Sequence, residues 1–170
     1  MLSKAYPNMK NYYGMIASLS FSISYSTGGV GAGMFVNKMP RKTLIAISCI
    51  LWSSCILTQG MTNSLLLFCI ARFAHGAFAA AYNPAAYSLI ADYFPPSHRS
   101  IANAVEASGQ YVGSALASMS IILIKNYGWR AMYNMVGFSG LFAALLSFFL
   151  IKEPKRELKK DSGPKVNPFV

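Results

Sequence analysis

Five long apolar stretches take up most of this chain of 170 residues. A helix that crosses a bilayer needs roughly 20 mostly apolar residues, and each stretch comes close to that length if brief polar interruptions are accepted. The connectors are short, so little sequence is left for a separate folded domain. We therefore predict an all-α, polytopic membrane helix bundle over residues 1–156, with a basic tail over 157–170. The predicted helices are residues 13–36, 43–59, 64–91, 101–124 and 129–151.

The composition fits a membrane protein and gives no sign of catalysis. Hydrophobic residues make up 54% of the chain and charged residues 12%, whereas charged residues are about 25% of a soluble domain. Cys49, Cys55 and Cys69 lie inside predicted helices without CxxC spacing, so we interpret them as small apolar residues. The sequence contains no nucleophile elbow, phosphate-binding glycine loop or metal-ligand cluster. We predict neither an enzyme nor a bound cofactor or metal.

The basic residues are distributed unevenly between the two sides of the predicted bundle. If the helices alternate in direction, one side carries ten Lys and Arg residues and the other carries four. The side with more basic residues is expected to be cytoplasmic, which places the N-terminus outside or in a lumen and the C-terminus inside. The net charge of +10 is then explained by membrane topology, and we expect no nucleic-acid partner.

Arg72 lies inside the third apolar stretch, where a charge is most costly. An ionised side chain at bilayer depth costs from about 2.5 to more than 10 kcal/mol, so it usually faces a polar interior and marks the route of a substrate or ion. His75 follows three residues later on nearly the same helix face and titrates near neutral pH. The two could bind an anionic head group or transfer a proton. Alternatively, Arg72 contacts backbone carbonyls or reaches the membrane surface, and His75 is a packing residue.

Four short sequence motifs follow one another along the chain. The first lies in the connector after the first predicted helix, the second begins at Arg72 and continues to about residue 99, and residues 109–115 and 128–130 follow. This series resembles helices two to six of the major facilitator superfamily, and is most similar to its spinster-like branch. The resemblance implies part of a secondary-active transporter for lipids or organic anions. The first motif consists of Gly33, Asn37, Lys38, Arg41 and Lys42.

The sequence departs from the family pattern at three places. Asn37 stands where the family has Asp, Pro40 where it has Gly, and Ala79 where spinster-like carriers have Glu. The first helix and the second half of the family fold are not matched, so we expect the lipid bilayer and further membrane chains as partners, with a small-molecule substrate. The alternative is a transporter-derived structural subunit of a larger membrane complex, without transport activity of its own.

Three further groups of residues complete the predicted sites. Tyr82 and Asn83 precede Pro84, which is expected to kink the helix, and with Gln110 they are candidates for the substrate or proton route. Glu106 is expected to pair with Arg99 or the basic connector at the inner boundary, where Asp92 has a similar role. Small residues recur at intervals of about four, which favours close helix packing; these include Gly29, Gly33, Gly109 and Gly113.

Overall fold

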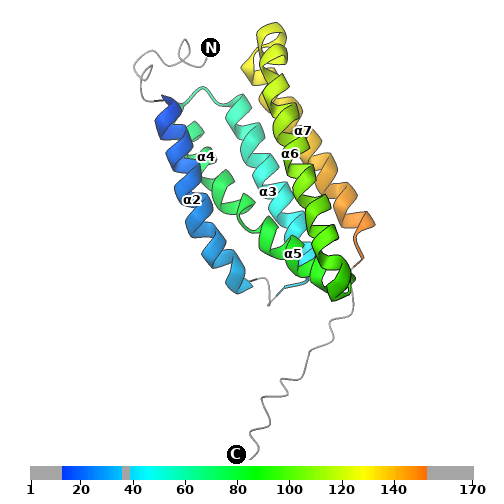
Figure 1. Ribbon diagram of the computed structural model, residues 1–170. Helices are drawn as coiled ribbons and strands as arrows, with labels where there is room; N and C mark the ends of the chain where they lie inside the picture. The colour runs from blue at the N-terminus through cyan, green and yellow to red at the C-terminus, as the bar shows by residue number, and fades with distance from the viewer. Residues whose placement is uncertain (1–12, 36–38, 153–170) are drawn as a thin grey trace, which may run out of the picture.

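The structure is a computed structural model that describes residues 13–35 and 39–152, and it contains a bundle of long helices lying side by side (Figure 1). The prediction of an all-α bundle is confirmed. Asn37, Lys38 and the predicted tail lie outside the described residues. The helices are α2 (Tyr13–Phe35), α3 (Arg41–Met61), α4 (Leu65–Ala79), α5 (Tyr82–Tyr93), α6 (Pro96–Tyr127) and α7 (Trp129–Leu150).

Two ends of the bundle can be distinguished. The Arg41 end, at the bottom of Figure 1, is where α3 begins and α5 ends, and the Arg130 end is where α4 and α7 begin. Within the described residues, four segments are long and apolar enough to cross a membrane: Arg41–Met61, Leu65–Tyr93, Pro96–Tyr127 and Trp129–Leu150. The remaining helix, α2, has 23 residues and no charge, but it is rich in serine and glycine.

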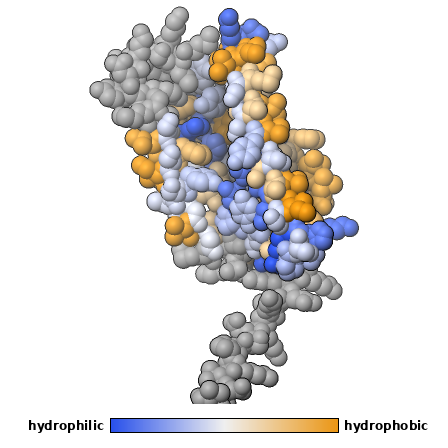
Figure 2. Space-filling view, in the orientation of Figure 1, coloured by the Kyte–Doolittle hydropathy of each residue, from blue (hydrophilic) through white to orange (hydrophobic). Residues whose placement is uncertain are grey.

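Apolar side chains point outward over much of the bundle. None of the 32 residues of α6 is buried, and large side chains such as Tyr111 and Ile121 are mostly exposed. Figure 2 shows hydrophobic residues on the outer flanks and hydrophilic residues along the furrow between α2 and α6. This distribution suits a bundle whose flanks face lipid.

One predicted helix is broken in two at Ala80 and Ala81, between α4 and α5. Pro84 has no N–H, so the Ala80 carbonyl loses its usual donor, and the proline ring crowds that carbonyl. At the same place the Ala81 N–H donates to the Phe78 carbonyl, only three residues back, at 3.3 Å, which tightens the chain locally. The kink predicted from Pro84 is confirmed.

The boundaries of α6 differ from the prediction. The helix begins at Pro96 rather than residue 101, because proline is suited to the first turn, where its missing N–H needs no partner. It ends at Tyr127, and Gly128 follows with φ 85°, a backbone conformation that glycine adopts readily. The helix is therefore longer at both ends than its apolar stretch suggests.

Glycines other than the predicted ones bring helices together among the described residues. A Cβ added at Gly76 would lie 2.6 Å from the Phe21 carbonyl oxygen of α2, and one at Gly137 would lie 2.6 Å from the Leu57 side chain of α3. A Cβ added at the predicted positions would meet nothing within 4 Å among the described residues. What those glycines pack against stays a prediction; they are Gly29, Gly33, Gly109 and Gly113.

The best buried apolar cluster lies between α3, α5 and α7. Its members are Ile45, Cys49, Ala85, Leu89 and Ala144, and the cluster includes one of the three predicted apolar cysteines. Tyr82 packs on its margin, with its ring centroid 5.7 Å from that of Trp52. These contacts give Tyr82 a packing role beside the kink.

Candidate functional site

A cavity of about 440 Å³ lies between α3, α4, α6 and α7, and Arg72 and His75 form its wall on α4. The sequence placed these two residues on one helix face, and the structure brings them to one cavity. The other lining residues are Ile56, Ala117, Ser120, Ile124, Met132, Tyr133 and Val136.

Arg72 is held from the side of α2. Its Cζ lies 5.2 Å from the centroid of the Phe21 ring, a distance at which the aromatic face attracts a cation. Its Nε is buried and has no hydrogen-bond acceptor among the described residues. A buried donor without a partner is costly, so this nitrogen retains an unused capacity to donate a hydrogen bond.

His75 shares the same aromatic neighbour. Its ring meets that of Phe21 edge to face, with centroids 5.3 Å apart and planes at 68°. Its Nδ1 is buried without a hydrogen-bond partner in the part of the chain that the structure describes. Arg72 and His75 therefore both line one cavity, and each has a buried polar atom without a partner among the described residues.

Close packing of α2 on α4 sets this geometry. Gly76 follows His75 directly and lies against Ser24 and Phe21, because glycine has no side chain to keep the backbones apart. The hydroxyl of Ser24 donates to the Phe21 carbonyl at 3.0 Å, so it is satisfied within its own helix.

A second polar site links α2, α5 and α6 through a chain of hydrogen bonds, here called the Tyr25 network. Asn83 Nδ2 donates to Tyr25 Oη at 2.9 Å, and Gln110 Nε2 donates to Asn83 Oδ1 at 3.4 Å and to Glu106 Oε1 at 3.0 Å. Two predicted route residues, Asn83 and Gln110, therefore lie together. Tyr25 was missed by the sequence analysis, because a tyrosine in a serine-rich helix carries no signal of its distant partner.

The predicted pair of Glu106 with Arg99 is not formed between these described residues. Arg99 Nε donates to the Phe94 carbonyl at 3.0 Å across the turn from α5 to α6. Glu106 is tied to Gln110 by one oxygen, and its other oxygen, Oε2, is buried without a hydrogen-bond partner in the described ranges. The carboxylate thus belongs to the Tyr25 network rather than to the end of the bundle.

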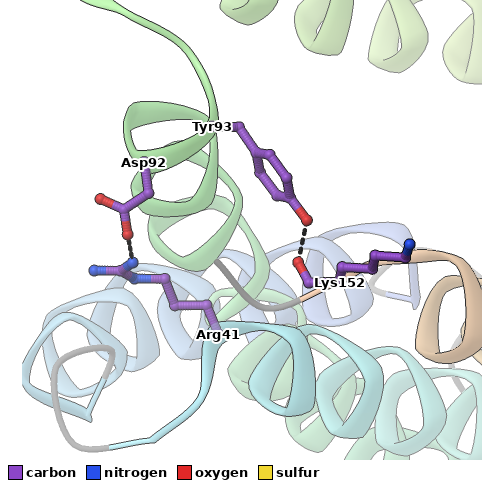
Figure 3. Close-up of polar contacts among 4 residues, drawn as sticks. All are labelled: Arg41, Asp92, Tyr93 and Lys152. Carbon is purple, nitrogen blue, oxygen red and sulfur yellow. Dashed lines mark hydrogen bonds and ion pairs between the residues drawn. The ribbon is translucent and has the colours of Figure 1, made fainter. Parts of the chain in front are cut away.

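Three contacts join helix ends at the Arg41 end, and Figure 3 shows two of them. Arg41, which is buried, forms an ion pair with Asp92 at the end of α5. The next residue, Tyr93, donates its hydroxyl to the Lys152 carbonyl after α7. Lys42 Nζ lies 4.6 Å from the centroid of the Phe148 ring. The start of α3 is therefore connected to the ends of α5 and α7.

Another arginine performs a similar role at the Arg130 end. Arg130 Nη2 donates to Asn63 Oδ1 at 2.6 Å and its Cζ lies 4.5 Å from the Trp129 ring centroid.

No group of three or more potential metal ligands occurs among residues 13–35 and 39–152. The chemistry these sites offer is binding of anions and polar groups.

Sequence comparison decides the family. The profile described as Major Facilitator Superfamily matches residues 3–170. The chain belongs to the Major Facilitator Superfamily. Its curated relatives include the probable galactarate/D-glucarate transporter of Bacillus subtilis, 30% identical over 156 residues, which cover 87% of this chain and 33% of that protein. The cis,cis-muconate transport protein of Acinetobacter baylyi is 27% identical, with 83% and 34% covered.

The fold of this superfamily member also has a solved counterpart. It resembles the inward-facing crystal structure of a bacterial homologue of the human lysosomal transporter spinster, with a TM-score of 0.66 and 23% identity, covering 81% of this chain and 34% of that one. The spinster-like resemblance is thus confirmed at the level of fold. The chain spans about one third of the length of these relatives. Because the relatives are named as transporters, they do not favour the alternative of a structural subunit without transport activity.

Proposed function

We propose that this chain forms part of a secondary-active transporter for small organic anions, with Arg72 contacting the anion. The observation that carries the proposal is the Arg72 side chain on the wall of a cavity of about 440 Å³, a cation whose buried Nε has no acceptor among the described residues. Hydrogen bonds to charged groups are stronger than neutral ones, so a carboxylate is the acceptor best suited to this position. Two relatives are named for transport of galactarate or D-glucarate and of cis,cis-muconate, which are carboxylates.

Other membrane segments are proposed to complete the transport route. Carriers of this kind transport their substrate by rocking two helical halves about a central site. We propose that the described helices belong to one of these halves. The Tyr25 network joins side chains of α2, α5 and α6. We propose that it forms a second polar wall of the transport route. His75 stands beside Arg72 as a donor or proton carrier.

The orientation follows from the basic residues. Arg41, Lys42, Arg99 and Lys152 lie at the Arg41 end, which we propose faces the cytoplasm according to the positive-inside rule. The first described helix, α2, would then begin on the outer or lumenal side. No catalytic activity is proposed.

Uptake by reconstituted vesicles tests the function. The chain, purified with the membrane segments that are joined to it or associate with it, is placed in proteoliposomes and supplied with labelled D-glucarate or neutral galactose. Substituting Arg72→Ala should lower glucarate uptake at least about tenfold, since charge-assisted hydrogen bonds contribute about 1.5–3 kcal/mol. Lys125→Ala, which removes one positive charge from the last turn of α6, is the matched control and should leave uptake unchanged.

Two outcomes would overturn the proposal. One is glucarate uptake that is unaffected by Arg72→Ala while Lys125→Ala behaves as wild type. The other is an absence of uptake of every anion supplied, in vesicles made from protein that is folded, as its thermal unfolding in detergent shows. Loss of uptake in both variants alike would also count against a specific role for Arg72.

A further inference from the structure

We propose that the cavity beside Arg72 prefers an organic anion with a compact apolar body, such as an aromatic ring carrying one carboxylate, over a polyhydroxylated sugar acid. This inference rests on the proposed function of the same site and names its substrate class. It arises from the contrast between the two sides of the cavity.

The polar side is small and lies on one helix. Arg72 and His75 of α4 line the cavity, and each also has a buried polar atom without a partner among the described residues. Around them, the only other side-chain polar groups among the lining residues are the hydroxyls of Ser120 and Tyr133. One carboxylate placed against Arg72 and His75 would occupy most of the polar capacity of these walls.

The rest of the lining is mostly apolar and comes from three helices. Ile56 comes from α3, Ala117 and Ile124 from α6, and Met132 and Val136 from α7. On α6 the lining residues recur at intervals of three and four, so they share one face. A volume of about 440 Å³ lies within the range of small-molecule sites, roughly 300–1,000 Å³.

These walls treat the two substrate classes differently. A sugar acid has a hydroxyl on each internal carbon, whereas the walls of α6 and α7 offer only the hydroxyls of Ser120 and Tyr133 among their lining residues. Sugar hydroxyls beyond those two would give up water without gaining a partner, which is unfavourable. An aromatic ring has no such groups, and it gains by covering apolar surface. The neighbouring Tyr133 ring, held edge to face by Phe68 and Trp129 with centroids 6.0 Å away in each case, offers it an aromatic surface.

Equilibrium binding distinguishes these classes. The purified transporter, with the membrane segments it is joined to or associates with, is titrated with benzoate, D-glucarate and benzyl alcohol. We expect benzoate to bind about tenfold or more tightly than D-glucarate, and benzyl alcohol to bind more weakly than benzoate because it has no charge for Arg72. D-glucarate binding as tightly as benzoate would overturn the substrate preference and leave the proposed function standing. No binding of either anion would overturn the proposed function itself.

A matched pair of variants tests whether the cavity wall causes the preference for benzoate over D-glucarate. Val136→Thr keeps the shape of a lining residue and adds a hydroxyl, so benzoate binding should weaken several-fold and its advantage over D-glucarate should narrow. Val112→Thr makes the same change on α6, at a residue that is exposed and does not line the cavity, and should leave both affinities unchanged. An unchanged ratio of affinities in Val136→Thr would overturn the assignment of the preference to these walls.

Discussion

The guanidinium of Arg72 lies over the ring of Phe21, with its Cζ 5.2 Å from the ring centroid. The contact joins α4 to α2, while the Arg72 side chain also lines the cavity and its buried Nε has no acceptor in the described residues. Phe21 also meets His75 edge to face. A single aromatic ring thus positions both polar residues of the candidate site.

Substituting Phe21→Leu should weaken anion binding without unfolding the bundle. A cation over an aromatic face gains about 0.5–2 kcal/mol, and a leucine would retain apolar contact while losing that attraction. We therefore expect a rise of about two- to thirtyfold in the anion concentration that gives half-maximal uptake. Phe142→Leu on α7, where the side chain is 69% exposed, is the control. Equal affinities for Phe21→Leu and wild type would show that the ring does not position Arg72.

Substituting Gly76→Ala should destabilise the packing of α2 on α4. The added methyl would lie 2.6 Å from the Phe21 carbonyl oxygen, and overpacking of this kind costs about 1–3 kcal/mol. The measurement is the free energy of unfolding in detergent micelles. Gly113→Ala on α6 meets nothing within 4 Å among the described residues, so it should be neutral or slightly stabilising, because alanine favours helices over glycine. Identical effects of the two substitutions would contradict this account.

The ion pair of Arg41 with Asp92 should appear as a coupling energy. Groups in direct contact show coupling of about 0.5–3 kcal/mol in double-mutant cycles, and Asp92 is partly exposed, with its side chain at 33%, which favours the lower part of that range. The cycle compares Arg41→Gln, Asp92→Asn and the double variant by unfolding in detergent. Additive effects of the two substitutions would show that the pair does not stabilise the Arg41 end.

The break between α4 and α5 should close when its cause is removed. Pro84→Ala restores an N–H that can donate to the Ala80 carbonyl, and it removes the ring that crowds that carbonyl. Backbone amides near the break should then exchange with solvent deuterium more slowly, as followed by mass spectrometry of peptides covering residues 78–86. Exchange at the wild-type rate would show that neighbouring helices, rather than Pro84, impose the break.

The sequence predicted what depends on local spacing. Arg72 and His75 share a wall because residues three apart lie on one helix face, and Pro84 breaks its helix for reasons confined to one turn. Packing partners could not be predicted in this way. Spacing groups Gly109 and Gly113 on one face of α6 but does not identify a partner for them, and none lies within 4 Å among the described residues. Gly76, in contrast, packs tightly with no glycine at an interval of four.

Contacts across the chain were also beyond the sequence. Tyr25 and Asn83 are 58 residues apart, and no local pattern pairs a tyrosine of α2 with an amide of α5. For the same reason the sequence predicts Arg99 or the basic connector as the partner of Glu106, whereas the fold also gives it an amide on its own helix one turn away. Burial and long-range geometry decide such contacts.

The Tyr25 network should contribute measurably to the association of α2 with α5. Tyr25→Phe removes the hydroxyl that accepts from Asn83 Nδ2 at 2.9 Å, leaving the ring in place. Hydrogen bonds between helices in membranes contribute on average about 0.6 kcal/mol and at most about 1.7 kcal/mol, so we expect a loss of that size in the free energy of unfolding in detergent. Tyr111→Phe, at a side chain that is 77% exposed on α6, should cost nothing. If Asn83→Ala already removes the same energy, adding Tyr25→Phe should have no further effect, and fully additive losses would show that the two side chains act independently.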